Sequence, residues 1–585
     1  MAARKDSRIL TSRATLAFIW RYLSYRGDLV ALFLLCAVAV VAAELSIPLF
    51  VMSAIDSVLE GSMTLDLNLW LVAMLGVLAL LYGFHVGLLR LEVSVILQAS
   101  YNLRRRLYEH IHAQAIPFFE RHSTGALMHR LTSDTEQFED EAASIFRDLP
   151  SEILTVIGVI IMMALLDMRM AALVVGFMSA AAALAWHIGQ PLADIRTSAQ
   201  NIASGLSARL QETLNGVRTV KAFKNEALEL QTLDRENRKT LETERREGQV
   251  EAWMEPLSDM IGIVGLVLVV WFGAHLISQD ALTAGGLIAF IAYMEILARP
   301  IGNLEHYIRS LQTCRAVGGR LDALFSDISE LPVKKGPSPD LGRLEISFDN
   351  VSFRYPKSRR KILDQVSFSA APGETIAVVG ANGAGKSTLT ELILRFYDPS
   401  EGQIRAGGVA LDTWPLEDWR LQIGVMQQDV FLFRGTIAEN IAYGRPGASK
   451  TEIAAAAEAA GLDRILKRLS QGLNTHLDER GTGLSGGERQ TVALARLYLR
   501  DPKIAILDEP TAHFDGEALH AARRRLSHFM KGRTVFLITH HQDMTALCER
   551  VLYLKNGRLA ETQNHETLLR MDEDYQMLWG ATQAA

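Results

Sequence analysis

The chain has 585 residues, which is more than one hydrophobic core usually holds, so several domains are expected. Hydrophobic residues make up 49% of it and charged residues 22%, a combination that predicts two unlike halves rather than one uniform globule. The formal net charge of −6 and the three scattered cysteines give no reason to expect nucleic acid as the main partner, a disulfide framework or a zinc site.

The N-terminal half contains six apolar stretches of the length that crosses a bilayer, roughly 20 residues. The third and fourth are separated only by Asp167–Met170, which predicts a tight helical hairpin. Residues 1–325 are therefore expected to form an α-helical membrane domain with six spans. The spans lie near Leu29–Met52, Leu69–Leu89, Leu149–Leu166, Met170–Ile188, Met260–Ile277 and Leu282–Leu297.

The distribution of Lys and Arg predicts how these spans are oriented. The connections after spans one and five carry neither residue, whereas Arg90–Pro150 carries seven and Pro191–Leu257 carries ten. These two segments and both termini are therefore expected in the cytoplasm. Their helical patterning favours spans that continue as long helices and turn once, near Gly125 and near Gly216, where glycine would permit the bend. A solvated charged loop is the alternative.

Ionisable residues lie within the predicted spans, among them Glu44, His85, His187 and Glu295. Such groups are costly in a bilayer unless they face a cavity, a partner or an interface. Glu44 and Glu295 lie well inside their spans and are candidates for a polar pathway. A structural hydrogen bond between helices is the alternative, and the sequence does not decide between the two.

The composition changes after Ser329–Gly342, which lies in a predicted linker over residues 326–343. Short β-branched runs (TIAVVG, QIGVMQ, KIAILDE and RTVFLITH) then alternate with helical patterns. This alternation predicts a mainly parallel sheet with helices on its faces. Residues 344–585 are therefore expected to form an α/β domain.

The first of these runs leads into GANGAGKST, which matches the phosphate-loop pattern G-x-x-x-x-G-K-[ST] in full, between a strand and a helical pattern. Backbone N–H groups of such a loop point at phosphate oxygens. Lys386 would contact the β- and γ-phosphates, and the hydroxyl of Ser387 would bind Mg²⁺. A site for ATP is therefore predicted over Gly380, Ala381, Asn382, Gly383, Ala384, Gly385, Lys386, Ser387 and Thr388.

The stretch AILDEPTAHFD ends an apolar run with two carboxylates. In a phosphate-loop fold, the acid at the end of a neighbouring strand holds Mg²⁺ directly or through water, and Asp508 occupies that position. Glu509 would then orient or deprotonate the attacking water. Capping of the next helix is the competing role for either acid, and Pro510, which follows directly, argues against it.

The decisive motif is the segment LSGGERQ, Leu484–Gln490. On this motif the chain resembles the ATP-binding cassette (ABC) transporters, specifically half-transporters of the exporter type. The segment begins a helical pattern, so Ser485, Gly486 and Gly487 supply a second set of free N–H groups for an anion. The resemblance implies an ATPase cassette with an α-helical subdomain. It also implies head-to-tail dimers, in which each ATP lies between the phosphate loop of one cassette and Ser485–Gly487 of the other.

The resemblance further implies roles for single residues. Tyr355 matches the aromatic residue that stacks on adenine. His540 matches the histidine that contacts the γ-phosphate, and His541 is the less favoured candidate. Gln428 matches the glutamine that senses Mg²⁺ and the membrane domain, although Gln427 beside it leaves the register open. Glu509, His540 and Gln428 are thus the predicted catalytic residues, and Ser387, Gln428 and Asp508 the predicted metal ligands.

The resemblance also implies contacts between subunits for two loops. Asp478–Gly481 resembles the exporter loop that senses the cytoplasmic turns of the partner, and those turns resemble the coupling helices that rest on the cassettes. Where exporters commonly have Ser-Ala-Leu-Asp after DEPT, this chain keeps only Asp515, expected at the nucleotide site. His513 and Phe514 are bulkier than usual. Either the facing surface accommodates them, or the partner is a different chain, or the variation is neutral.

The leading prediction is an ATP-driven, multi-pass transporter of the cell inner membrane that uses ATP and Mg²⁺ and exports a lipid-like, drug-like or peptide substrate. An importer of the same architecture, for example for metal–siderophore complexes, and an ATP-gated channel or regulator are alternatives. Six spans exclude a soluble cassette ATPase. The expected partners are the lipid bilayer and a second half-transporter. One chain carries both halves of the composite ATP site, which favours a homodimer over a heterodimer.

Overall fold

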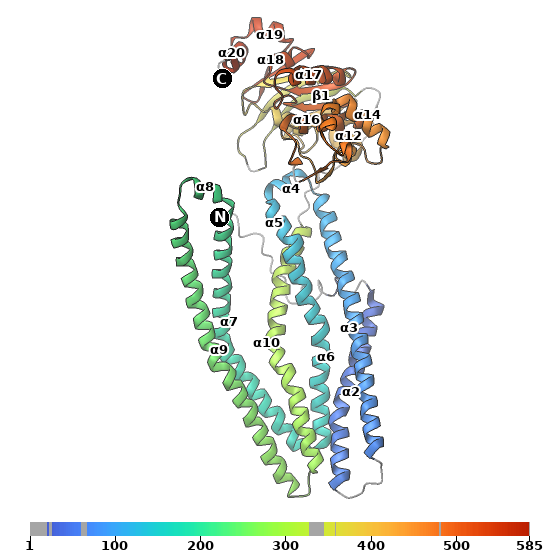
Figure 1. Ribbon diagram of the computed structural model, residues 1–585, viewed down its shortest axis with the longest axis vertical. Coiled ribbons are helices and arrows are strands. Elements are labelled where there is room, and N and C mark those ends of the chain that lie inside the picture. Colours follow the sequence, from blue (N-terminus) through green and yellow to red (C-terminus); the bar gives the residue numbers. More distant parts are fainter. Residues whose placement is uncertain are drawn as a thin grey trace. The chain divides into compact units, whose positions relative to one another are not determined.

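The computed structural model describes residues 20, 22, 26–59, 67–326, 344–356, 358–478 and 481–583. Contacts divide the chain into two compact units, and each is described by itself (Figure 1). The first unit contains Met1–His112 and Thr124–Asp327, and the second contains Ala113–Ser123 and Ile328–Ala585. The predicted linker lies outside the described residues apart from Ser326, as do two residues of the predicted exporter loop, Glu479 and Arg480.

Each predicted span lies in a separate long helix of the first unit. At about 1.5 Å per residue, helices of this length reach roughly 50–78 Å, well beyond a hydrocarbon core of about 30 Å. The spans therefore continue out of the apolar region as helices, as predicted. The six helices are α2 (Gly27–Leu59), α3 (Leu67–His112), α6 (Thr135–Leu166), α7 (Met168–Asn215), α9 (Glu226–Ile277) and α10 (Ala284–Ser326).

Five segments of the described chain are long and apolar enough to cross a membrane by length and composition. The fourth predicted span begins α7, where the described apolar stretch, Met168–Leu184, is shorter. The helical membrane part of the predicted fold is confirmed by these helices. The five segments are Gly27–Leu59, Trp70–His112, Thr124–Leu166, Asp259–Ile277 and Ala284–Ser326.

The hairpin between the third and fourth spans is tighter than the sequence indicates, because a single residue joins α6 to α7. Asp167 ends one helix and caps the next, and its carboxylate accepts hydrogen bonds from the backbone N–H groups of Arg169 and Met170 at 2.9 and 3.0 Å. The guanidinium of Arg169 also pairs with this carboxylate at 2.9 Å. The N-terminal amides of α7 are thereby satisfied by the connecting residue itself.

The prediction that the chain bends at Gly125, in the long connection after the second span, is wrong. Gly125 lies inside α5 (Thr124–His129), and the chain turns earlier, between the end of α3 at His112 and α4 (Ile116–Arg121). Pro117 occupies the first turn of α4, where its fixed φ favours the start of a helix, so the short helix begins before the glycine is reached. A π-helical segment, Arg130–Asp134, then leads into α6.

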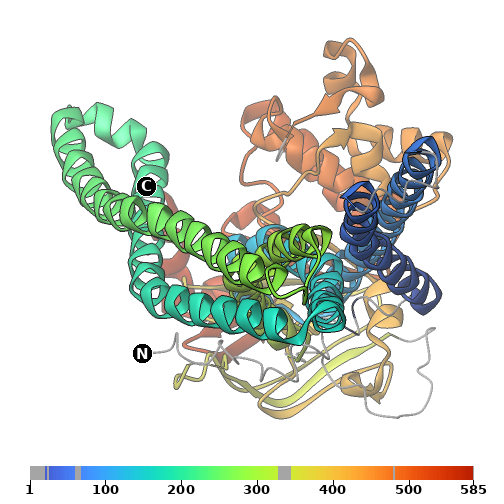
Figure 2. The same ribbon diagram turned by 90° about the horizontal axis from the view of Figure 1, so that it is seen from below.

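At the second turn the prediction is confirmed. Gly216 ends α7 and precedes the short helix α8 (Val217–Ala222), which leads into α9. None of the residues of α8 is buried. In both views the end of the α7–α9 pair that carries α8 lies away from α6 and α10 (Figures 1 and 2). The other ends of these helices share a buried core that includes Val159, Met163, Met170 and Val174.

Polar side chains in the helical unit are paired across helices. Arg299 of α10 lies 3.5 Å from the carboxylate of Glu44 in α2, which supports an interhelical contact for that predicted pathway residue. Glu295, His85 and His187 are exposed. Ion pairs and hydrogen bonds that the sequence did not predict join α6 to its neighbours, between Arg147 and Glu92 at 3.2 Å and between Asn303 and Glu152 at 2.8 Å.

The second unit contains the predicted parallel sheet. Its strand order is β12-β11-β3-β10-β9-β6, and all neighbours run parallel except β11 and β12. The four β-branched runs of the sequence are β3, β6, β9 and β10, so this part of the fold is confirmed. The strands are β3 (Thr375–Gly380), β6 (Ile423–Met426), β9 (Ile504–Asp508), β10 (Thr534–Ile538), β11 (Arg550–Lys555) and β12 (Arg558–Gln563).

A second, antiparallel sheet packs on the first and was not predicted. Its order is β2-β1-β4-β5, and a core that includes Phe348, Phe368 and Phe536 joins it to the parallel sheet. A separate two-stranded sheet pairs β7 with β8. The strands are β1 (Ile346–Phe353), β2 (Leu363–Ala370), β4 (Glu401–Ala406), β5 (Val409–Ala410), β7 (Gly435–Thr436) and β8 (His476–Leu477).

Helices cover the other face of the parallel sheet, where a second core includes Leu494, Leu526 and Phe529. The helix α4 belongs to this unit, since Ile116 packs against the core between the two sheets. The helices of this unit, of which α11 and α12 instead pack in the core between the two sheets, are α11 (Lys386–Ile393), α12 (Leu416–Leu421), α13 (Ile437–Ala442), α14 (Lys450–Ala460), α15 (Asp463–Arg468), α16 (Gly486–Arg500), α17 (Gly516–Met530), α18 (Gln542–Thr545), α19 (His565–Met571) and α20 (Glu573–Gln583).

Candidate active site

The predicted phosphate loop connects β3 to α11 at the carboxyl end of the parallel sheet. Gly385 has φ of 106° and caps α11, and a Cβ there would lie 2.6 Å from Cδ2 of Leu363. A Cβ on Gly380 would lie 2.4 Å from the carbonyl oxygen of Leu554. Only glycine fits both positions, because a side chain would meet either a positive φ or a neighbouring backbone. The loop therefore presents its backbone amides ahead of α11.

Lys386 is held at the centre of this loop. Its ammonium group donates hydrogen bonds to the carbonyl oxygens of Gly380 and Ala381 at 2.7 and 3.1 Å. Burial lowers the pKa of Lys386, and the nearby carboxylates of Glu509 and Asp508 oppose that shift. Burial raises the pKa of Asp508, and Glu509 adds to the shift while Lys386 opposes it. The three groups thus form one electrostatically coupled set.

Glu509 is joined to His540 across the neighbouring strand ends. Nε2 of His540 lies 3.3 Å from Oε1 of Glu509, whose side chain is 12% exposed against 45% for the histidine. The backbone N–H of Glu509 donates to the carbonyl of Ile538 at 2.9 Å, and its φ of 48° lies in the left-handed region. Non-glycine residues seldom adopt this conformation, and such strain often occurs at functional sites. His541 instead caps α18, so the structure brings the favoured histidine to the carboxylate.

Lys386, Asp508, Glu509 and His540 lie at or after the ends of β3, β9 and β10, which the sheet register aligns. Val378 of β3 pairs with Ile538 of β10, which pairs with Asp508 of β9. The side chains of Lys386, Asp508, Glu509 and His540 are named the charged cluster below. Gln427 and Gln428 follow β6, the neighbour of β9, and both are exposed at the same edge of the sheet. The structure leaves the choice between these two glutamines open.

Tyr355 is bound to the helix that follows the phosphate loop. Its hydroxyl donates to Oε2 of Glu391 at 2.6 Å and lies 3.0 Å from the hydroxyl of Thr388. The ring makes edge contacts with Phe353 and Tyr397 at centroid distances of 5.0 and 5.3 Å. Burial raises the pKa of Tyr355 to about 12, and its hydrogen bond to Glu391 adds to the shift. The aromatic ring is thus fixed relative to the loop.

The predicted second anion site lies at the start of α16. Ser485 caps this helix in a capping box, since its hydroxyl accepts from the N–H of Glu488 at 3.3 Å and its own N–H donates to the Glu488 carboxylate at 2.8 Å. Arg468 also pairs with Glu488. Ser485, Gly486 and Gly487 are named the signature end below. Its backbone amides are ordered by the capping box before any ligand arrives.

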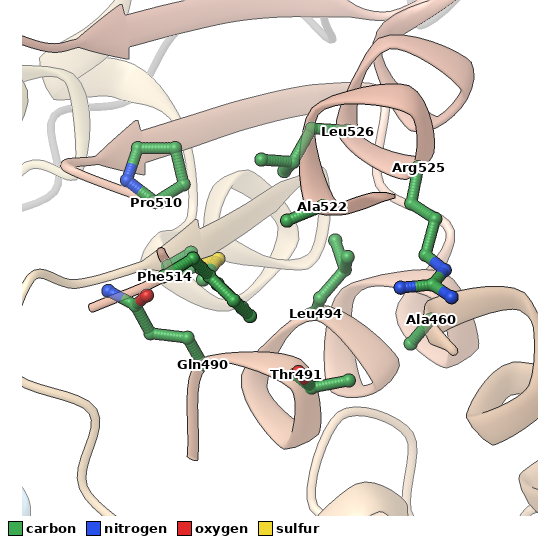
Figure 3. Close-up of a pocket in the computed structure, with 10 residues that line it drawn as sticks. Ala460, Gln490, Thr491, Leu494, Pro510, Phe514, Ala522, Arg525 and Leu526 are labelled. Carbon is green, nitrogen blue, oxygen red and sulfur yellow. The ribbon is translucent and has the colours of Figure 1, made fainter. Parts of the chain in front are cut away.

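His513 and Phe514, the residues that depart from the family pattern, pack against the signature end of the same chain. A Cβ on Gly486 would lie 2.7 Å from Cδ2 of His513, and one on Gly487 would lie 3.1 Å from Cδ1 of Phe514. Phe514 also points into a small cavity that Thr491 also lines (Figure 3). The two bulky residues therefore have room within their own chain.

Comparison with known families decides the identity of this arrangement. Residues 30–301 match the model of the ABC transporter transmembrane region, and residues 363–512 match that of the ABC transporter cassette. An uncharacterised ABC transporter ATP-binding protein of Bacillus subtilis, YknV, is 32% identical over 94% of this chain and 92% of its own length. The chain belongs to the ABC transporters.

Other similar proteins refine this assignment. The ATP-dependent lipid A-core flippase of Burkholderia thailandensis is 30% identical over 94% of this chain and 93% of its own length. That of Syntrophus aciditrophicus is 32% identical over 82% of this chain and 79% of its own length. A solved structure of a bacterial Atm1-family ABC exporter with ATP bound has a TM-score of 0.77 and 27% identity, over 96% of this chain and 99% of that one.

This ABC transporter is accordingly a half-transporter, with one membrane domain and one cassette in a single chain. It is an ATP hydrolase and an ATP-driven exporter, and the comparisons support export rather than the import that the sequence left as an alternative. A half-transporter acts as a dimer in a membrane. The predicted family, fold class and enzyme class are confirmed.

The donor atoms of this ABC transporter suit Mg²⁺. Ser387, Asp508 and Gln428 offer oxygen ligands, which hard cations prefer. Over the described residues no group of three or more His, Cys, Asp and Glu side chains could hold a metal ion alone. In nucleotide sites Mg²⁺ is held by one or two protein groups together with substrate phosphates. Ser387 is exposed at the start of α11, where a phosphate-bound cation could reach it.

Two residues beside the site were not assigned roles from the sequence. Gln490 is buried, and its side-chain amide donates to the carbonyl of Glu509 at 3.3 Å, which joins α16 to the charged cluster. Glu391 holds the hydroxyl of Tyr355. Gln490 belongs to the LSGGERQ segment, so its position gave a signal that could have been used. Glu391 lies in an ordinary helical pattern and gave none.

Proposed function

We propose that the chain forms a homodimer in the cell inner membrane, with termini and cassettes in the cytoplasm, and exports a lipid-like amphipathic molecule. The contact between His540 and Glu509 beside Lys386 and Asp508 carries this proposal. A chain that uses its cassette only as a binding partner has no need of an ordered carboxylate and histidine. Because the same chain also has an ordered signature end, two copies would contain two equivalent ATP sites.

In this proposal the phosphate loop, Gly380–Thr388, surrounds the phosphates with its amides, and Lys386 exchanges its two carbonyl partners for phosphate oxygens. Tyr355 stacks on the adenine ring, and Asp515 belongs to the same nucleotide site. Ser387, Asp508 and Gln428 hold Mg²⁺, which neutralises the phosphate charge when it is bound. Ser485–Gly487 of the second copy closes the site by donating N–H groups to the γ-phosphate.

Hydrolysis then follows from the geometry around Glu509. Its carboxylate accepts a proton from a water molecule as that water attacks the γ-phosphorus, while the bond to the β-phosphate oxygen breaks and ADP leaves. His540, 3.3 Å from Glu509, orients the carboxylate and contacts the γ-phosphate. The left-handed backbone of Glu509 supports this role, because it aims a side chain away from the regular direction of β9.

The helix α4 is proposed to carry the movement of the cassette to the spans. Ile116 packs against the core between the two sheets, the core that Tyr355 also contacts. Burial raises the pKa of Tyr397, and the nearby carboxylate of Glu120 in α4 adds to this shift. A change at the phosphate loop could therefore reach α4 through the side chains of this shared core. The exposed helix α8 is proposed to contact the cassette of the second copy, because no residue of α8 is buried within its own chain.

The proposed substrate class rests on the similarity to the lipid A-core flippases and on the surface of the spans. Several spans carry large apolar side chains that are highly exposed, among them Leu35, Leu71, Tyr82 and Leu165. Such side chains suit contact with lipid chains. Glu44 and Arg299 add an ion pair to α2 and α10 that could meet a charged headgroup.

Reconstitution tests the proposal. The chain expressed alone would be purified, placed in liposomes, and tested for its mass, its ATPase rate and the movement of labelled lipids between leaflets. We expect an active dimer whose ATPase rate is stimulated by an amphipathic lipid, and no movement of lipid by the Glu509→Gln variant. An inactive monomer that a co-expressed second half-transporter activates would contradict the homodimer. Stimulation by siderophores or peptides alone would contradict the lipid-like substrate.

A further inference from the structure

The loop between Glu509 and α17 brings an imidazole to the signature end. His513 is exposed, and its ring carbons Cγ and Cδ2 would lie 2.8 and 2.7 Å from a Cβ on Gly486. The histidine side chain therefore occupies the volume next to the backbone that begins α16. Exporters commonly have alanine at the position of His513. The imidazole of this chain therefore adds a group that can carry charge to a surface that otherwise offers neutral amides.

The loop is ordered, so this contact has a structural basis. The N–H of Ala512 donates to the carbonyl of Glu509 at 3.1 Å, and that of Phe514 donates to the carbonyl of Thr511 at 3.2 Å. Phe514 anchors the loop by packing on Gly487 and by pointing into the cavity beside α16 (Figure 3). His513 lies between these two fixed points, and its side chain remains exposed.

We propose that His513 is a ligand of the ATP γ-phosphate, acting across the dimer together with the signature end of its own chain. The proposal rests on the proposed function, in which the signature end closes the ATP site of the second copy. A group in contact with Gly486 then lies beside the γ-phosphate. A protonated imidazole donates a charge-assisted hydrogen bond to a phosphate oxygen, which is stronger than the bond from a neutral amide.

The charged groups around His513 leave this role open to it. On α16, Glu488 is occupied by the capping box and by Arg468, and Arg489 donates to the carbonyl of Leu484 at 2.7 Å. At the start of α17, Asp515 and Glu517 are exposed carboxylates. Glu509, at the other end of the loop, pairs with His540. A phosphate would bring the additional negative charge that favours protonation of the imidazole.

The expected signature is a contribution that depends on the γ-phosphate. In the Glu509→Gln background, which prevents turnover, we expect His513→Ala to weaken ATP binding about tenfold. ADP binding should be unchanged, because ADP has no γ-phosphate. His520→Ala, which removes an exposed histidine from α17, is the matched control.

A mixed dimer separates this inference from the proposed function. One copy carries Lys386→Ala, so ATP binds only to the loop of the other copy, and both carry Glu509→Gln. We expect His513→Ala to weaken ATP binding when placed in the Lys386→Ala copy and not when placed in the other. Ser485→Ala in the Lys386→Ala copy should also weaken it. If Ser485→Ala acts and His513→Ala does not, the role of His513 is overturned and the shared site stands. If neither acts, the shared site is overturned as well.

Discussion

The charged cluster and the signature end both bind phosphate in the proposed function, yet they are prepared for it in different ways. In the charged cluster, Lys386 is held by two carbonyl oxygens, and Glu509 pairs with His540. ATP must replace these internal partners. At the signature end, the capping box uses the N–H of Ser485, and the amides of Gly486 and Gly487 lie in the first turn of α16, where a helix offers them no acceptor of its own. The charged cluster would therefore bind ATP by exchanging its internal partners for phosphate oxygens. The amides of Gly486 and Gly487 would bind phosphate without such an exchange.

This difference assigns distinct functions to the two sides. Exchange of charged partners couples nucleotide binding to a rearrangement within one cassette, which suits the chemical step. A rigid, neutral helix start requires no rearrangement and suits an interface that opens and closes repeatedly. Substitutions should therefore act on turnover at the charged cluster and on dimer closure at the signature end.

The largest expected effect comes from Glu509→Gln. The amide keeps the shape of the side chain but cannot accept a proton from water, so kcat should fall by about 10²- to 10⁴-fold while ATP still binds. Steady-state ATPase rate and nucleotide binding are measured together. Glu517→Gln, an exposed carboxylate at the start of α17, is the control and should leave the rate unchanged. Turnover near the unsubstituted rate would remove Glu509 from the role of base.

Lys386→Ala should act on binding first. The substitution removes a charge that would contact the phosphates, and hydrogen bonds to charged groups contribute about 1.5–3 kcal/mol, so nucleotide affinity should fall roughly 10- to 100-fold. Direct binding of a labelled nucleotide measures it. Lys467→Ala, on the exposed side of α15, controls for the loss of a positive charge. Equal affinities for the two variants would contradict partner exchange at Lys386.

A pair of glycine substitutions tests how the signature end is packed. The Cβ of Gly486→Ala meets the side chain of His513, whereas that of Gly487→Ala meets the carbonyl oxygen of His513 at 3.0 Å and the ring of Phe514. Overpacking costs about 1–3 kcal/mol, so each variant should lose about tenfold in ATPase rate. At saturating ATP, where a loss of affinity does not limit the rate, adding His513→Ala should restore the Gly486→Ala variant only, because the backbone obstacle at Gly487 remains. Equal restoration of both would show that His513 does not touch Gly486 in the working dimer.

The smallest effect is expected at Tyr355, which belongs neither to the charged cluster nor to the signature end. Tyr355→Ala should raise KM for ATP about fivefold or more with little change in kcat, since stacking is made equally in the ground and transition states. Tyr355→Phe keeps the ring but loses the hydrogen bonds to Glu391 and Thr388, worth about 0.5–1.5 kcal/mol, and should raise KM only a few-fold. Steady-state kinetics of both variants compare the ring with its hydroxyl. A fall in kcat at constant KM would contradict the adenine contact.

The sequence predicted those parts of the fold that depend on local patterns. A strand leading into GANGAGKST and a second strand ending in Asp508 placed the charged cluster, because parallel strands bring their carboxyl ends to one edge. The segment LSGGERQ likewise predicted the start of α16 at Ser485, Gly486 and Gly487. The long helices followed from apolar stretches continued by charged helical patterns.

Contacts between distant segments could not be predicted in this way. The bend expected at Gly125 occurs earlier, because the short helix α4 begins at Ile116, has Pro117 in its first turn and packs on the cassette core through Ile116. The antiparallel sheet pairs strands whose register depends on tertiary packing. The contact of His513 with Gly486 joins residues 27 positions apart, and the left-handed φ of Glu509 has no sequence signal, since glutamate does not favour it.

The one-residue connection at Asp167 also has a mechanical meaning. Close to it, α6 and α7 share buried core residues, whereas the far end of the α7–α9 pair carries α8 without a buried side chain. Such an arrangement is a lever with its fulcrum at Asp167. With 48 residues, α7 has an arm of about 72 Å, so a rotation of only about 5° at the fulcrum displaces α8 by roughly 6 Å. Small repacking around Met163 and Met170 would therefore be amplified into a large displacement of α8.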